Sequence, residues 1–92
     1  MARRIQERRR EPHPPSGEPV NGKRLIAQNL RALRTRAGLS QEALADRARI
    51  HRTYVGGVER AERNISIDLI CRLAWALNVH PSELLAPPQS DA

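Results

Sequence analysis

The segment SQEALADRARIHRTYVGGVER, residues 40–60, constrains the fold of this chain more than any other stretch. Apolar or small residues recur there at helical spacing in two short runs, at Ala43, Leu44, Ala48, Ile50, Val55 and Val58. This spacing predicts two short helices that are joined by a tight turn and cross over a common core. The outward positions of the second helix carry groups that can hydrogen-bond to bases or phosphates.

Helical patterns continue on both sides of this pair and predict an all-α domain over residues 23–85, with no strand and no internal repeat. Ser40 and Ser66 suit helix N-caps, and Asn78 suits the left-handed turn after a helix. Five helices are expected, over about residues 23–37, 41–48, 52–60, 67–77 and 81–85. The inward face of the fourth is assigned to Ile67, Ile70, Leu73, Ala74 and Leu77.

The two ends of the chain differ from this domain. Residues 1–22 hold four prolines and few apolar side chains, which predicts a disordered Arg/Pro-rich tail. Residues 1–10 carry five arginines against one acid, Glu7, and three interpretations stay open: a fraying helix, a basic arm along DNA, or a solvated tail. Residues 86–92 are predicted to fray.

The charge balance favours a polyanionic partner. Sixteen Lys and Arg against ten acids give a formal net charge of +6, which attracts DNA, RNA or an anionic membrane surface. No run of about 18 apolar residues exists, so no membrane span is expected. The absence of a secretory apolar stretch and the single cysteine fit a cytoplasmic, nucleoid-associated protein.

Catalytic and metal sites are not expected. His13, His51 and His80 are dispersed, and Cys71 lies at no zinc-ligand spacing from them. No nucleophile–base pair or phosphate-binding glycine loop is present in the sequence. The chain is therefore predicted not to be an enzyme and to use no cofactor.

Residues 25–85 resemble the Cro and phage-repressor (XRE-type) family of helix-turn-helix proteins. The resemblance rests on LRALRTRAGLSQ, the ALA of the second helix, the VER that ends the third, and LAWALNVHPSELL, in family order and spacing. It implies a five-helix lambda-repressor-like domain that binds double-stranded DNA. In this family the start of the third helix enters the major groove, and the start of the second meets the phosphate backbone.

The resemblance also implies individual roles. Arg52 and Thr53 would read bases, with Tyr54 and Gly57 beside them. Ser40 and Gln41, at a helix N-terminus, would anchor a phosphate. For Arg52 and Gln41 a plain surface position is the alternative, and Tyr54 would otherwise pack on the core edge or the backbone.

Two further groups follow from the family pattern. Arg34 and Glu59 would form a structural ion pair that fixes the third helix to the first. Arg63 and Asn64, in RAERNIS after an upstream RTY, resemble the controller proteins of restriction–modification systems, in which this loop meets phosphates and approaches bases. For Asn64 the alternative is a plain turn residue.

The sequence departs from the family at several positions. Arg49 and Ala61 stand where a glycine is usual, so a left-handed conformation there is strained. His51 is a poor N-cap for the third helix. Gly56 and Gly57 weaken that helix but allow close approach to DNA or to the second helix.

A single reading helix offers too little contact for tight selective binding, which predicts a homodimer. Cys71 and Trp75 are four residues apart and share one helix face. With Val79 and Leu84 (or Leu85) they are predicted to face a second copy. In the alternative, Trp75 covers the domain's own edge beside Val79.

The sequence therefore favours a bacterial, sequence-specific transcription regulator that acts as a homodimer on an inverted repeat. The alternatives are an antitoxin-like partner of an unknown protein with DNA autoregulation, a restriction–modification controller, and a basic RNA-binding protein. The operator, the regulated genes and the choice between activation and repression are not encoded in any recognisable pattern.

Overall fold

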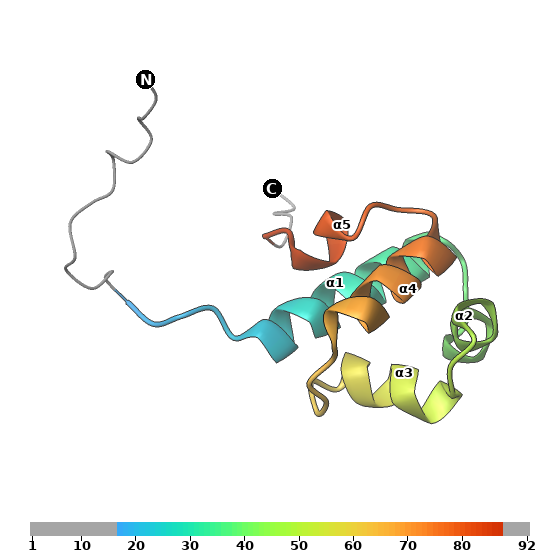
Figure 1. Ribbon diagram of the computed structural model, residues 1–92, viewed down its shortest axis with the longest axis horizontal. Helices are drawn as coiled ribbons and strands as arrows, with labels where there is room; N and C mark the ends of the chain where they lie inside the picture. Colours follow the sequence, from blue (N-terminus) through green and yellow to red (C-terminus); the bar gives the residue numbers. More distant parts are fainter. Residues whose placement is uncertain (1–16, 88–92) are drawn as a thin grey trace, which may run out of the picture.

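The computed structural model describes residues 17–87 of the 92-residue chain, and this part contains five helices and no strand. The helices are α1 (Gly22–Arg36), α2 (Gln41–Ala48), α3 (Arg52–Glu59), α4 (Ile67–Leu77) and α5 (Ser82–Leu85) (Figure 1). The predicted all-α, five-helix architecture is confirmed. The predictions for residues 1–16 and 88–92 lie outside the described residues.

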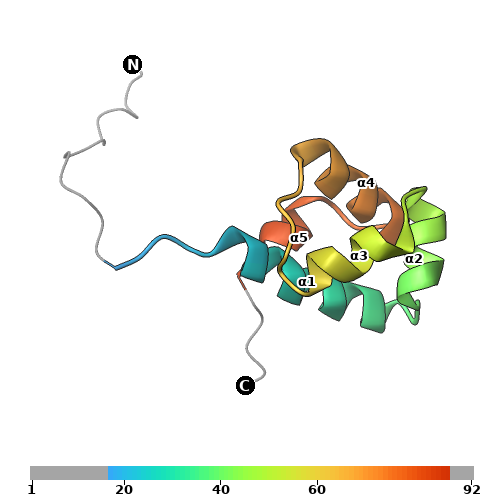
Figure 2. The same cartoon turned by 90° about the horizontal axis from the view of Figure 1, so that it is seen from below.

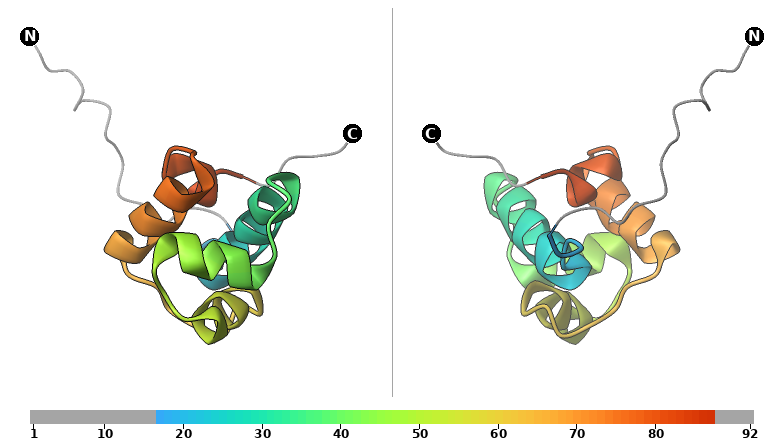
Figure 3. Two further views of the ribbon diagram at one scale, coloured as in Figure 1. Left: turned by 90° about the vertical axis from the view of Figure 1, so that its right-hand side faces the viewer. Right: turned by 90° about the vertical axis from the view of Figure 1, so that its left-hand side faces the viewer.

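The helices pack around α1 and α2. Helix α1 contacts α3 on one side and α5 on the other, so that α3 and α5 lie on opposite sides of the domain (Figures 1 and 2). Helix α2 packs against both α3 and α4, and Figure 3 shows α2 and α3 beside each other at one end of the molecule. This arrangement leaves one side of α3 facing away from the rest of the protein.

Every helix contributes at least one fully buried side chain to a single core. These are Leu30, Leu44, Val55, Val58, Leu73 and Leu84. Burial of a side chain of this size is worth about 1.5–3 kcal/mol. Because α3 and the short α5 contribute to the same core as α1, α2 and α4, the five helices depend on one another for stability.

Hydrogen bonds at the helix starts fix where the helices begin. The Oγ of Ser40 accepts from the Ala43 backbone N–H (2.9 Å), and the Oγ of Ser66 accepts from the Leu69 N–H (3.1 Å), as the sequence predicts. A third cap, Asn21, accepts from the Arg24 N–H at 3.1 Å. Asn21 lies within the predicted tail, so the ordered domain begins slightly earlier than expected.

Three residues other than glycine have left-handed backbones: Arg49 (φ 62°), Ala61 (φ 61°) and Asn78 (φ 60°). Each follows a helix, where a left-handed residue lets the chain turn away. Asn78 was predicted from its residue type, and Arg49 and Ala61 occupy the positions where the family usually has glycine. Left-handed geometry costs Arg49 and Ala61 roughly 1–2 kcal/mol each, whereas asparagine adopts it more readily.

Two predicted positions are wrong: Ile67 was assigned to the inward face of the fourth helix, and Leu84 to the contact with a second copy. Ile67 is 77% exposed, because it occupies the first turn of α4, where no other helix covers it. Ala76 is buried in its place on the inward face. Leu84 is fully buried in the core while Leu85 is 52% exposed, so Leu84 is not available to a second subunit.

Helix α5 is held to α1 by a polar residue that the sequence pattern did not reveal. The buried Asn29 donates from Nδ2 to the carbonyl oxygens of Leu84 and Ala86, both at 2.8 Å. These bonds satisfy two carbonyls at the end of α5 that have no partner within the helix. Asn29 therefore fixes the C-terminal part of the domain.

Candidate nucleic-acid interface

Helix α3 is exposed at its start and buried at its end. Arg52 and Thr53 are exposed, Tyr54 is half-buried, and the residues from Val55 to Glu59 are buried. The preceding His51 has the extended backbone of an N-cap (φ −73°, ψ 142°) but makes no capping hydrogen bond. The start of α3 is therefore an accessible edge whose first backbone N–H groups have no partner within the helix.

The buried end of α3 is fixed by Glu59, whose side chain is almost completely covered. Arg34 donates from Nε to Glu59 Oε2 (2.6 Å) and from Nη2 to Oε1 (3.0 Å). Its Nη1 also donates to the Leu39 carbonyl (2.8 Å). This two-pronged geometry, which suits a planar guanidinium and a carboxylate, joins α1, the α1–α2 loop and α3.

Two other side chains reach the same carboxylate. Gln41 Nε2 donates to Glu59 Oε1 at 2.9 Å, and Arg31 Nε lies 3.8 Å from that oxygen. Burial by itself would raise the pKa of Glu59. The hydrogen bonds from Arg34 and Gln41, with the charges of Arg34 and Arg31, outweigh burial and hold that pKa below its ordinary value. The hydrogen bond to Glu59 likewise raises the pKa of Arg34.

The contact with Glu59 limits how Gln41, predicted to anchor a phosphate at the start of α2, can bind an anion. One N–H of its amide is committed to Glu59, so the side chain links α2 to α3. The exposed Ser40 caps the helix, and the first backbone N–H groups of α2 remain as donors for an anion. Gln41 thus couples the beginning of α2 to the end of α3.

Tyr54, Gly57 and Arg63 form one cluster across α3. Tyr54 packs against the edge of the core, and the guanidinium carbon of Arg63 lies 5.0 Å from the centre of its ring. Gly57 is buried beneath the Arg63 side chain: a Cβ built on Gly57 would lie 2.9 Å from Arg63 Nε and 3.0 Å from Cγ. Gly57, predicted to lie beside the base readers, is therefore covered by Arg63.

Asn64 continues the loop after Arg63, and both residues are exposed. The left-handed residue of this loop is Ala61, and Asn64 does not have a positive φ. Asn64 is thus not needed for an unusual backbone conformation, and its side chain is accessible.

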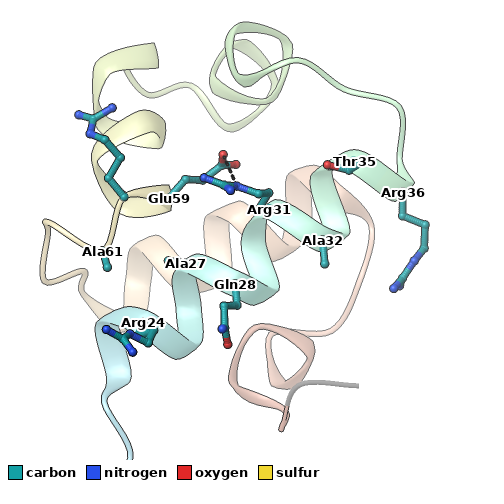
Figure 4. A pocket seen from close by; sticks show the side chains of 10 residues that line it. Arg24, Ala27, Gln28, Arg31, Ala32, Thr35, Arg36, Glu59 and Ala61 are labelled. Atoms are coloured by element: carbon teal, nitrogen blue, oxygen red, sulfur yellow. Dashed lines mark ion pairs between the residues drawn. The ribbon is translucent and has the colours of Figure 1, made fainter. Parts of the chain in front are cut away.

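A shallow hollow of about 850 Å³ lies between α1 and the end of α3 (Figure 4). Four arginines line it: Arg24, Arg31, Arg36 and Arg60. Figure 4 shows Arg31 directed toward Glu59, with Arg24 and Arg36 toward opposite ends of the hollow. Arg31 and Arg60 each face a carboxylate, Glu59 and Glu62. Because Glu59 is the one acid in the lining, the four arginines leave the hollow with a net positive charge.

The outer face of α4 carries an apolar stripe, which consists of Ile67, Cys71 and Trp75 at four-residue steps. All three are exposed, and Trp75 is 64% exposed. Val79, predicted to join them, is half-buried against the core. The exposure of Trp75 contradicts the alternative in which it covers the domain's own edge.

Within residues 17–87, no group of three His, Cys, Asp or Glu side chains could hold a metal ion. None of the helices in this part of the chain is long and apolar enough to cross a membrane.

This geometry agrees with the comparison with known proteins. Residues 30–84 match the helix-turn-helix family, and the chain belongs to that family. The control protein C.SmaI of Serratia marcescens is 46% identical over 63 residues, which cover 68% of this chain and 75% of that protein. The sequence-based assignment to the family is confirmed.

Two solved structures resemble the domain closely. The crystal structure of the restriction–modification controller protein C.AhdI from Aeromonas hydrophila has a TM-score of 0.67 and is 49% identical, covering 71% of this chain and 98% of that one. A hypothetical transcription factor from Neisseria has a TM-score of 0.72 and is 40% identical, covering 82% and 88%. The similarity to controller proteins expected from the RTY and RAERN segments is present.

Proposed function

We propose that this protein is a sequence-specific DNA-binding transcription regulator that places the start of α3 in the major groove. The observation that carries this proposal is the division of α3: Arg52 and Thr53 are exposed, while Glu59 is held by the buried ion pair. A helix fixed at one end and open at the other can present side chains to base edges in a constant orientation.

The exposed residues have the chemistry that this role needs. Arg52 can donate to both O6 and N7 of guanine, and the Thr53 methyl can contact the thymine methyl. Ser40 and the N–H groups at the start of α2, with Arg63 and Asn64, would contact phosphates and set the register. The arginine-lined hollow adds positive charge beside α3 and favours association with DNA.

The apolar stripe on α4 supports the proposal of a homodimer. A second copy that packs on Ile67, Cys71 and Trp75 around a two-fold axis would cover these side chains symmetrically. Leu85, rather than Leu84, has the exposure needed to join them. Such a dimer would hold two copies of α3 about 34 Å apart, which matches half-sites of an inverted repeat.

The similarity to C.SmaI and C.AhdI favours one kind of regulator. We propose that the chain is the controller of a restriction–modification system. The gene for this chain should then adjoin a restriction gene, and a reporter behind the promoter of that gene should respond to this protein. A response only at unrelated promoters would contradict the controller role and leave DNA binding intact.

Selection of bound sequences from a random duplex pool tests base reading. The wild-type protein should select an inverted repeat, and Arg52→Ala should lose about 1–3 kcal/mol of specific affinity with relaxed preference at one position per half-site. Arg47→Ala, an equal loss of charge at the exposed far end of α2, should retain the selected sequence. An unchanged sequence and affinity in Arg52→Ala would refute the placement of α3.

Sedimentation tests the dimer. Trp75→Glu introduces a charge into the stripe and should give a folded monomer with most of its operator affinity lost, because burial of an unpaired carboxylate is unfavourable. Gln28→Glu adds the same charge to the exposed face of α1 and should remain dimeric. A Trp75→Glu protein that still sediments as a dimer would exclude this interface.

A further inference from the structure

The two adjacent glycines of α3 have different neighbours. At Gly56 an added Cβ would lie 3.1 Å from Arg60 Nη1, the far end of a flexible side chain, and 3.5 Å from Gln41 Oε1. At Gly57 it would lie 2.9 Å from Arg63 Nε and 3.0 Å from Arg63 Cγ. The Cγ belongs to the stem of the side chain, so Arg63 cannot avoid the new atom by moving its tip alone.

We propose that Gly57 is a positioning residue for DNA recognition. Its missing side chain lets Arg63 lie across α3 with its guanidinium over Tyr54. The inference rests on the proposed DNA-binding function. Arg63 comes from the loop after α3, and the crossing at Gly57 brings its charge back to the exposed side of the helix. Arg52 and Arg63 then act together, one from the helix and one from the loop.

The charge of Arg63 is available for this role. Within residues 17–87 Arg63 makes no ion pair, while Arg34, Arg31 and Arg60 each face a carboxylate. The ring of Tyr54 holds the guanidinium by a cation–π contact, which leaves its N–H groups free to donate. A held arginine loses less conformational freedom on binding than a free one, so its contact with DNA is stronger.

Gly57 also lowers the stability of α3, and the proposed positioning role explains why a glycine occupies this place. Glycine inside a helix is less favourable than alanine, because it loses more backbone freedom on folding. A position that served helix stability alone would therefore favour alanine. At position 57 alanine would displace the Arg63 side chain. The residue that is best for helix stability would therefore be unfavourable for DNA recognition.

The test compares Gly57→Ala, Gly56→Ala and Arg63→Ala in duplex-DNA affinity and in thermal midpoint. Arg63→Ala should weaken specific binding by about tenfold. Gly57→Ala should show a similar loss, and Gly56→Ala should bind like the wild type. The double variant Gly57→Ala/Arg63→Ala should bind no more weakly than Arg63→Ala alone, because both changes remove the same contact. Wild-type affinity in Gly57→Ala, or losses that multiply in the double variant, would overturn the proposal.

If Gly57→Ala folds poorly, thermal stability in place of DNA affinity can be compared among the same single and double variants. Removal of Arg63 in that background should then restore folding, because the clash disappears and the gain in helix propensity remains. A Gly57→Ala variant that stays unfolded without the Arg63 side chain would contradict the contact.

NMR of the free protein separates this inference from the proposed function. The Tyr54 ring should shift the Arg63 side-chain resonances in the wild type and in Gly56→Ala, and Gly57→Ala should abolish the shift. An unchanged shift in Gly57→Ala would overturn the positioning role without reference to DNA. If the wild type binds all duplexes alike while the shift behaves as expected, the proposed sequence reading fails and the Gly57–Arg63 contact stands.

Discussion

The two halves of α3 differ in almost every physical respect. Arg52 and Thr53 at its start are exposed and have no side-chain cap before them. From Val55 onward the helix is buried: Val55 and Val58 are fully covered, and Glu59 accepts hydrogen bonds from α1 and α2. One half belongs to the core and the other to the surface.

This difference in burial shows how a helix of only eight residues can hold a binding surface in a fixed orientation. A free helix of this length would be marginal in water, and Gly56 and Gly57 weaken it further. Its shape therefore comes from the packing of its second half, which fixes the direction of the first. We expect substitutions in the second half to change stability and substitutions in the first to change binding.

The largest expected effect tests the buried half. Glu59→Ala should destabilise the domain by about 3–5 kcal/mol, because it leaves the Arg34 guanidinium without its partner. Arg52→Ala should change stability by less than about 0.5 kcal/mol. Urea denaturation of the two variants measures both values, and equal stability losses would remove the contrast between the halves.

Much of this architecture could be predicted from the sequence. The helices could be located from helical spacing together with the caps Ser40 and Ser66 and the left-handed Asn78. The exposed start of α3 could be located from the RTY–VER segment. Arg34 and Glu59 were paired from the family pattern and lie in contact. The ion pair spans 25 residues and was found only through the family resemblance. The other features are local, and a single sequence displays them directly.

The errors arose where tertiary packing decides. Ile67 fits the helical period but lies in the first turn of α4, beyond the reach of the core. In the four-residue α5, periodicity could not decide which of Leu84 and Leu85 points inward. The contact of Gly57 with Arg63 spans a loop, and no spacing rule predicts that a side chain will cross back over its own helix.

A smaller effect follows from pH. Because the pKa of Glu59 is lower in the folded protein than its ordinary value of about 4.3, the unfolded chain takes up this proton first on acidification. The stabilisation by Glu59 is complete above the unfolded pKa and is lost as pH falls through the folded pKa. The raised pKa of Arg34 keeps that partner charged throughout this range.

Stability should therefore decline as pH falls below about 4.3. Glu59→Gln, which has no carboxyl to titrate, should show a shallower decline than the wild type. Thermal melts across this range measure both slopes. Equal slopes would mean that other carboxylates dominate the acid transition and that the buried half has no special sensitivity to pH.

The smallest effect concerns the exposed half. His51 has N-cap backbone geometry but makes no side-chain capping hydrogen bond. Serine at this position can accept from the Thr53 or Tyr54 N–H, so His51→Ser should stabilise the domain by about 1 kcal/mol. His51→Asp should stabilise it at least as much, because a negative charge also suits the helix N-terminus.

The two variants should then separate in DNA binding. Serine adds no charge and should leave affinity close to that of the wild type, whereas the Asp carboxylate at the reading edge would face the phosphates and weaken binding. A higher salt concentration should reduce the difference in DNA affinity between the two variants, since screening weakens the repulsion between the carboxylate and the phosphates. If both variants bound alike at low salt, the start of α3 would not lie near the DNA backbone. Stability gained at this end with affinity lost would show that the two halves of α3 are shaped by different requirements.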